Sequence, residues 1–437
     1  MYAVCSIIAQ DGEAQKEPIQ SITEDRRETL LYGIDDQVIE LIVQLNEEKD
    51  DTLAGEVFAA YKTTRNPKVR SAIFTYFKEI GFEDAREDAL SIIDTADDQT
   101  TELISAAIDY LSVKAEPELA DRLIPLLDSP DMGIARKAIK GIGASQKADT
   151  IDTLLGLLDD GDYPNDLKPD VILALGELKN PAAVPRLVEI LDDEGEDIIW
   201  RRYACASLGK IGDPEILPKI EEALYDTDPM LRNYAVASLK YFDDPEVVDL
   251  LIAALKDSYW RTRISAASGL GSLKEERAVP ILAYKAEKDP ETNVRVEAVR
   301  ALGAIATPEA IEALRGFYSN ESTPPSLRVV SAEILAEKDI DASLELFTAV
   351  INKHWGKDRT RILERTAKIL SKTKSDSLES LYAKFLVSGE LVIMIYGLRG
   401  IATNEMISLK AEVEKLSGEE NHRSIRKEAL AALEVLE

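Results

Sequence analysis

The sequence is poor in the residue types from which most chemical sites are built. It has two histidines, two cysteines and three tryptophans in 437 residues, and aromatic residues make up only 6% of it. His354 and His422 are too few for a metal site of several imidazoles, and Cys5 and Cys205 cannot form a disulfide framework. No run reaches the roughly 18 apolar residues that a transmembrane helix requires. We therefore expect no metal, no cofactor and no integral membrane segment.

Positive charge is also scarce. The chain has 52 Lys and Arg against 81 Asp and Glu, which gives a formal net charge of −29. Nucleic-acid binding requires a basic face that displaces counterions, and anionic membranes attract basic segments. The charge therefore excludes nucleic acid and an anionic membrane surface as expected partners. It fits a surface kept soluble by self-repulsion, or acidic clefts that attract basic peptides.

The first residues resemble the end of a secretory signal. Met1–Gln10 reads MYAVCSIIAQ, has the small Ala9 at a suitable cleavage point and is followed by a polar stretch. A basic region before the apolar residues is missing. Two interpretations stay open: Met1–Ala9 is the remnant of the signal peptide of an exported, periplasmic protein, or it is the frayed terminus of a cytoplasmic one. Both predict that residues 1–22 are disordered.

A repeat of about 32 residues organises the rest of the chain. In its clearest copies an Arg is followed by small apolar residues three and four positions later and by Leu seven positions later, which is one stripe of an α-helix. We call the first residue of each copy its template position. The template positions are Val38, Arg70, Ile104, Ala135, Lys168, Arg201, Arg232, Arg263, Arg295, Arg328, Leu363, Leu391 and Arg426.

A second apolar pattern follows each template helix. It begins with a proline after a capping residue, as in Asn180-Pro181, Asp213-Pro214, Asp244-Pro245 and Thr307-Pro308. A Leu-Gly pair supplies the expected stop of many template helices. Each unit is therefore a hairpin of two helices that cannot bury its apolar face alone, and stacked units make an α-solenoid.

The combined pattern P-x-h-h-x-x-L and D-x-x-x-x-x-R-x-x-A-h-x-x-L-G resembles HEAT repeats, in particular the short bacterial type of the phycobilisome lyases. The resemblance covers about residues 36–437 and implies an all-α, right-handed α-solenoid of about thirteen antiparallel helix pairs. Residues 23–35, with Thr23 at the start and Arg26 and Arg27 outward, are expected to form an N-terminal capping helix. The repeat spacing is irregular near residues 319–375, where we expect a change of curvature.

The resemblance also implies a ladder of Asp and Arg side chains along the turns between helices. Each Asp stands six residues before an Arg, so it can accept hydrogen bonds from the turn while the Arg pairs with it or with its neighbour. The predicted ladder residues are Asp226, Arg232, Asp257, Arg263, Asp289 and Arg295.

The best candidate for a binding site is a cluster of aromatic and basic residues. In HEAT-like stacks the template helix lines the concave face, with positions one, two, five and nine residues after the template position in the groove. Tyr203 and Tyr234 are equivalent and should stack about 10 Å apart. An alternative is that the tryptophans fill gaps between repeats and the tyrosines cover the stack. The candidate residues, of types enriched at binding hot spots, are Trp200, Arg202, Tyr203, Asn233, Tyr234, Tyr241, Trp260 and Arg261.

Catalytic patterns are missing from the sequence. The Gly-x-Gly pairs at 141–143 and 269–271 lack the third glycine of a phosphate loop and are interpreted as helix ends. Deoxyhypusine hydroxylases, which are also HEAT-like, are known for His-Glu metal pairs, but here Trp355 follows His354 and Arg423 follows His422. The acidic loops at 159–170 and 192–197 do not have the order of a calcium loop.

These observations favour a non-enzymatic scaffold that binds a partner protein or peptide along the concave face. The alternative is an enzyme, or an enzyme accessory, related to phycobilin lyases and acting on a small ligand in the groove. The last helix, Ser424–Leu436, has Ile425, Leu433 and Leu436 on one face, so the sequence also allows self-association through this end of the chain.

Overall fold

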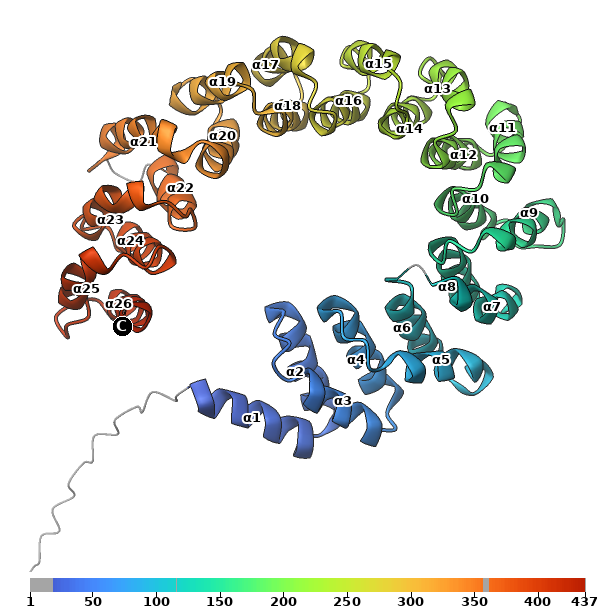
Figure 1. Ribbon diagram of the computed structural model, residues 1–437, viewed down its shortest axis with the longest axis horizontal. Coiled ribbons are helices and arrows are strands. Elements are labelled where there is room, and N and C mark those ends of the chain that lie inside the picture. Colours follow the sequence, from blue (N-terminus) through green and yellow to red (C-terminus); the bar gives the residue numbers. More distant parts are fainter. Residues whose placement is uncertain (1–18, 115, 357–360, 437) are drawn as a thin grey trace, which may run out of the picture. The chain divides into compact units, whose positions relative to one another are not determined.

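The computed structural model describes residues 19–114, 116–356 and 361–436, and these form helices without a strand (Figure 1). The expected all-α solenoid is confirmed. Contacts divide the chain into two compact units, Met1–Ile211 and Gly212–Glu437. The interpretation of Met1–Ala9 as a signal remnant lies outside the described residues.

In the first unit, even-numbered helices pack side by side in one layer and odd-numbered helices form a second layer behind them. We call the even-numbered helices the inner layer and the odd-numbered helices the outer layer. The inner helices are α2 (Asp35–Glu48), α4 (Pro67–Ile80), α6 (Thr101–Leu111), α8 (Met132–Ala144), α10 (Lys168–Glu177) and α12 (Ile198–Ile211). The outer helices are α1 (Ile19–Tyr32), α3 (Ala54–Thr63), α5 (Arg86–Asp94), α7 (Pro117–Leu123), α9 (Ile151–Asp159) and α11 (Val184–Asp192).

The second unit repeats this arrangement. Its inner helices are α14 (Pro229–Ser238), α16 (Trp260–Ser272), α18 (Thr292–Ile305), α20 (Pro325–Lys338), α22 (Arg361–Leu370), α24 (Leu391–Thr403) and α26 (Arg423–Val435). Its outer helices are α13 (Leu217–Ala223), α15 (Glu246–Ala254), α17 (Val279–Lys288), α19 (Pro308–Ser319), α21 (Ile340–His354), α23 (Glu379–Leu386) and α25 (Lys410–Leu416).

Every template position falls within an even-numbered helix, so the repeat is confirmed. The register is wrong by three residues in α24, where Gly397, Leu398 and Ile401 are buried and the equivalent position is Met394 rather than Leu391.

The apolar stripe that follows the template position is the core of the stack. In α16 the side chains of Ala266, Ala267 and Leu270 are fully buried. The small side chains three and four residues after the template position allow neighbouring helices to approach, and the Leu seven residues after it fills the space next to them.

Several outer helices begin with a 3₁₀ turn, where the sequence predicted an α-helix from the proline onward. These turns include η4 (Pro181–Ala183), η5 (Pro214–Ile216) and η7 (Glu276–Ala278). In η4 a second proline, Pro185, has no N–H to donate to the carbonyl of Pro181, which accepts from the N–H of Val184 instead. The predicted caps are confirmed, since the Asn180 side chain accepts from the N–H of Ala182.

The template helices end close to the predicted glycines, but these glycines do not act as the stop. Gly176 and Gly271 of the Leu-Gly pairs, and Gly143 of the Gly-x-Gly pair, are each the last but one residue of α10, α16 and α8, and none of them has a positive φ. A Cβ at Gly271 would lie 2.9 Å from the Cα of Ala301 in the next inner helix. The glycines therefore serve close packing of neighbouring helices rather than a left-handed stop.

Helix α1 begins at Ile19, four residues before the predicted Thr23, and Pro18 precedes it in the sequence, as is favoured at a helix start. It packs on α2 and α3 and so takes the outer position of the first helix pair. Arg26 does not point outward as expected. It forms ion pairs with Glu48 and Asp50, which hold α1 against the end of α2.

The predicted apolar face of the last helix is not open. Ile425 and Leu436 are buried against the neighbouring helices, and Leu433 is half-buried, because α26 packs on both α24 and α25. The residues chosen for self-association therefore belong to the core of the second unit. The change of curvature expected near residues 319–375 stays a prediction.

Candidate functional site

The predicted aromatic and basic cluster is divided between the two units. Trp200, Arg202 and Tyr203 lie on α12 of the first unit, and the other five residues lie in the second. Tyr203 and Tyr234 are both half-buried. Their stacking would join the two units, and it stays a prediction.

Trp200 covers a buried cation within the first unit. The Lys168 Nζ lies 5.9 Å from the centre of the Trp200 ring and donates to the backbone carbonyls of Leu158 and Asp160. Lys168 stands at the template position of α10, where seven other units have Arg. The Trp200 ring therefore lies over a cation of the preceding repeat, and whether it fills a gap or binds a partner stays a prediction.

The first turn of α16 presents a compact aromatic and basic cluster in the second unit. The Arg261 guanidinium lies 4.5 Å from the centre of the Trp260 ring, and one of its N–H groups donates to the Tyr259 hydroxyl at 2.5 Å. The same hydroxyl lies 3.1 Å from the Met230 sulfur of α14. Arg261 is exposed and Trp260 is half-buried. These contacts fix the side chains in advance, as in a binding hot spot.

The remaining candidates have different surroundings. The Asn233 side chain accepts a hydrogen bond from the Ser265 hydroxyl of α16 at 2.9 Å. Tyr241 is 42% exposed but does not extend α14, because the helix ends at Ser238 and continues as the 3₁₀ turn η6 (Leu239–Tyr241). The Lys240 Nζ lies 5.0 Å from the Tyr241 ring centre.

The Arg and Asp residues of the turns join consecutive units. Arg232 donates two hydrogen bonds to the carboxylate of Asp257, at 2.8 and 3.0 Å, and Arg263 does the same to Asp289, at 2.9 and 2.7 Å. Each Arg pairs with the Asp of the following unit, and donates to the backbone carbonyl of the Asp six residues before it. Arg295 donates to the carbonyl of Ala286.

The carboxylates of this ladder are held in the charged form. Burial raises the pKa of Asp257, but hydrogen bonds from Arg232 and from the N–H of Tyr259 outweigh it, and the pKa lies below its usual value. In the same way, burial opposes the hydrogen bonds from Arg263 and from the N–H of Glu291, which lower the pKa of Asp289. The ladder therefore stabilises the stack and positions Tyr259.

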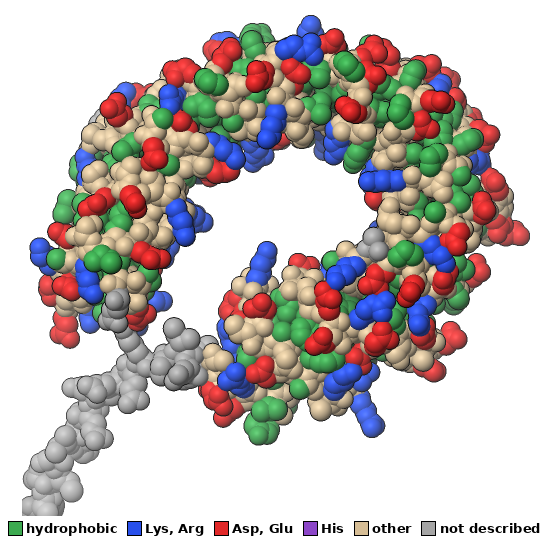
Figure 2. Space-filling view, viewed as in Figure 1, with side chains coloured by type: hydrophobic (Ala, Val, Ile, Leu, Met, Phe, Trp, Pro, Cys, Tyr) green, Lys and Arg blue, Asp and Glu red, His purple; other side chains and the backbone are tan. Residues whose placement is uncertain are grey.

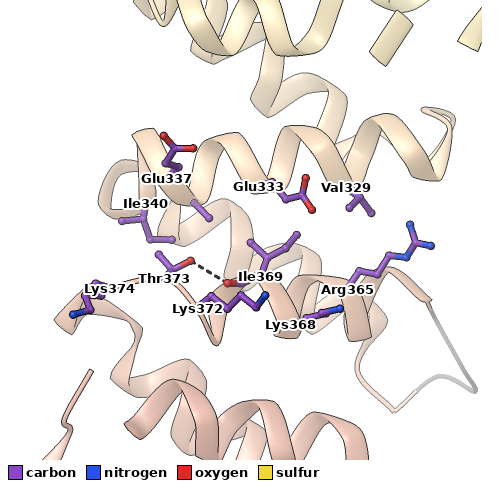
Figure 3. A pocket seen from close by; sticks show the side chains of 11 residues that line it. Val329, Glu333, Glu337, Ile340, Arg365, Lys368, Ile369, Lys372, Thr373 and Lys374 are labelled. Atoms are coloured by element: carbon purple, nitrogen blue, oxygen red, sulfur yellow. Dashed lines mark hydrogen bonds between the residues drawn. The ribbon is translucent and has the colours of Figure 1, made fainter. Parts of the chain in front are cut away.

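Sequence reasoning missed a cavity of about 740 Å³ between α20 and α22 (Figure 3). Its floor is apolar, and it includes Val329, Ala336, Ile340 and Ile369. Basic side chains from α22 and the turn after it stand on one side: Arg365, Lys368, Lys372 and Lys374. Glu333 and Glu337 come from α20 on the other side. We call this cavity the α20–α22 cleft.

The side chains that face each other across α20 and α22 differ from those of several other repeats. In some repeats a glycine eight residues after the template position faces a small residue of the next inner helix, as Gly143 faces Ala174 and Gly176 faces Ser207, whereas Gly303 faces the larger Ile334. The equivalent places in α20 and α22 hold Ala336 and Ile369. Both of these side chains line the cleft.

Arg365, Lys368 and Lys372 are exposed and form no ion pair with any residue that the structure describes. They stand two, five and nine residues after the template position Leu363, and these are places that the repeat assigns to the groove. Residues 365–374, RTAKILSKTK, contain no carboxylate. That run, in a chain with 81 acidic residues, was the signal that could have found the site.

The inner layer of the second unit is basic although the chain is acidic. Its helices contain 14 Lys and Arg against 6 Asp and Glu, while the outer helices of this unit contain 8 against 12. Figure 2 shows Lys and Arg side chains along the edge formed by these inner helices. Four of the 14, Arg232, Arg263, Arg295 and Arg328, donate to groups of the turns, which leaves 10 basic against 6 acidic residues in the inner helices. The inner layer of this unit thus keeps a basic excess, while its outer layer is acidic.

Groups for catalysis or metal binding do not gather in the parts of the chain that are described. No three His, Cys, Asp or Glu side chains converge there on a common point. Nine described carboxyl groups have a pKa below the usual value. Cys205 is fully buried. Among the described helices none is both long and apolar enough to cross a membrane.

The stacked hairpins and their Asp–Arg turns define an α-solenoid of the HEAT class. The family described as spirochaete HEAT repeat protein matches residues 30–432, and the chain belongs to this family.

Individual relatives are more distant. A deoxyhypusine hydroxylase of Candida albicans is 28% identical over 132 residues, which are 28% of this chain and 41% of the hydroxylase. The chain thus spans about two fifths of that relative. The complex of CpcE and CpcF of phycocyanin lyase from Nostoc matches 53% of this chain and 92% of that one, with 23% identity and a TM-score of 0.33. An importin beta structure matches 95% of this chain and 62% of that one, with 16% identity and a TM-score of 0.42.

Proposed function

We propose that this protein is a scaffold that binds a partner protein or peptide along the inner layer of its second unit. The observation that carries the proposal is the separation of charge between the two layers of this unit. A face with an excess of cations on a chain of charge −29 attracts partners that the rest of the surface repels.

Side chains of hot-spot type lie on this face. Arg261 on Trp260 supplies an exposed aromatic and cationic surface, and Arg300 on α18 supplies a second exposed cation in a neighbouring unit. Aromatic and Arg side chains contribute most to binding when they are already held in place. The face therefore offers several adjacent anchors to one extended partner.

Crosslinking in the native cell, with the full chain as bait, tests the proposal. Arg261→Glu/Arg300→Glu should reduce recovery of the partner about tenfold or more, because it reverses two charges on the inner layer. The matched control is Arg277→Glu/Lys288→Glu, which makes the same charge change at exposed positions of η7 and α17. Equal recovery from the inner variant and the wild type would show that partners bind elsewhere.

A small-ligand function is the second candidate, and the α20–α22 cleft is the observation that favours it. Its volume suits a small molecule, and charged groups of both signs converge there. Turnover or spectral change on incubation with bilins would favour this candidate, and loss of it in Lys368→Ala would locate the site in the cleft.

A further inference from the structure

We propose that the α20–α22 cleft binds an acidic, amphipathic segment of a partner protein. The inference rests on the proposed function and adds to it the site and the chemistry of the partner. It starts from the pairing of an apolar floor with cations that have no carboxylate partner among the described residues.

The cations are arranged to receive more than one anionic group. Arg365 and Lys368 are about one turn apart on α22, about 4.5 Å along its axis, and Lys372 follows the end of the helix. All three are exposed, so they keep their hydration until a partner arrives. Arg binds a carboxylate through two parallel hydrogen bonds, while Lys acts as a mobile point charge.

The floor of the cleft requires apolar groups on the ligand. Val329 and Ile369 come from the two facing helices, and Ile340 lies at the start of α21 (Figure 3). A phosphate ion fills little of a volume of about 740 Å³ and leaves this surface in contact with water. A peptide with alternating acidic and aliphatic side chains satisfies both parts of the cleft.

Glu333 restricts further the class of ligand that the cleft can bind. It extends from α20 into the cleft opposite the cations (Figure 3), so a uniformly anionic polymer such as a nucleic acid meets a repelling group. The net charge of −29 repels the same polymer over a longer range. A peptide can avoid Glu333 by placing a neutral or basic residue there.

Fluorescence anisotropy with the full chain tests the proposal. The probe is a short fluorescein-labelled peptide of glutamates with interspersed leucines. Arg365→Glu/Lys368→Glu should weaken its binding at least about tenfold, and so should added salt. Arg277→Glu/Lys288→Glu on the outer layer should leave the affinity within about twofold of the wild type. Peptides with lysine for glutamate, or serine for leucine, should bind several-fold more weakly.

Three results would overturn the proposal. One is an unchanged affinity of the cleft variant, and a second is tighter binding of an oligonucleotide of equal charge. The third is an equal loss in the cleft variant and in Arg261→Glu/Arg300→Glu, which would mean that the whole inner layer attracts the peptide. In that third case the cleft is not the site, while the proposed scaffold function stands.

Discussion

At the scale of single residues, the turns between helices depend on charged groups held in fixed places. Arg263 is 8% exposed in its side chain and Asp289 is fully buried, so neither charge is compensated by water. A buried ion pair of this kind is costly to break, since removal of one partner leaves the other charge alone. The Asp also accepts a turn N–H, which is why Asp rather than Glu stands here.

The lowered pKa of Asp257 makes part of the stability depend on pH. An aspartate in an unfolded chain has a pKa of about 3.9. Because the folded pKa lies below that value, the stabilisation is complete at higher pH and is lost as the pH falls through the folded pKa. Asp257→Asn should lower the free energy of unfolding by about 1–2 kcal/mol at pH 7. The free energy of unfolding of this variant should also decrease less than that of the wild type as the pH is lowered.

Urea denaturation at a series of pH values measures this effect. The control is Asp243→Asn, which removes an exposed carboxylate near the end of η6. If the free energy of unfolding falls with decreasing pH to the same extent in the wild type and in Asp257→Asn, the ladder carboxylate does not contribute to the pH dependence of stability.

At the scale of helices, small residues at one place in several repeats allow neighbouring inner helices to approach closely. The sequence indicated where the inner helices lie, but it assigned their glycines to helix ends. The structure places these glycines in contact with the next helix, where Gly176 lies against Ser207. Ala336 and Ile369 stand at the equivalent places of α20 and α22, and both line the α20–α22 cleft.

Gly271→Ala tests the role of close packing. The added Cβ would lie 2.9 Å from the Cα of Ala301, and backbone cannot move aside as a flexible side chain can. We expect a loss of about 1–3 kcal/mol in the free energy of unfolding. Gly316→Ala in α19 is the matched control, since no atom lies within 4 Å of its new Cβ. It should be neutral or stabilise by up to about 1 kcal/mol, because alanine favours helix. Equal effects in calorimetry would contradict the packing role.

At the scale of the whole molecule, each unit is a stack in which a helix pair contacts only its neighbours. Stability in such a stack is local, and a defect in one pair weakens mainly the adjacent ones. The same organisation lets one stack have a basic inner layer and an acidic outer layer. The inner helices of the first unit, in contrast, hold 10 Lys and Arg against 10 Asp and Glu, so the basic inner layer belongs to the second unit.

Hydrogen exchange monitored by mass spectrometry should show this locality. Arg263→Ala leaves Asp289 buried without its main partner and should destabilise its surroundings by about 3–5 kcal/mol. Exchange should become faster in α14, α16 and α18, and should stay unchanged in α2 and α4 of the first unit. Arg300→Ala, on an exposed part of α18, should change little. Uniformly faster exchange along the chain would show global rather than local unfolding.

The sequence by itself determined the repeat, because helical periodicity, proline starts and capping residues act over a few neighbouring positions. It located every inner helix and most ladder residues, such as Arg232 and Asp257. It also gave the rule for the groove positions, although its candidates were placed near residues 200–261. Only the tertiary structure decided how closely neighbouring helices approach, because that distance depends on which side chains meet across them. The α20–α22 cleft is one example, since Ala336 and Ile369, which both line it, stand 33 positions apart in the sequence.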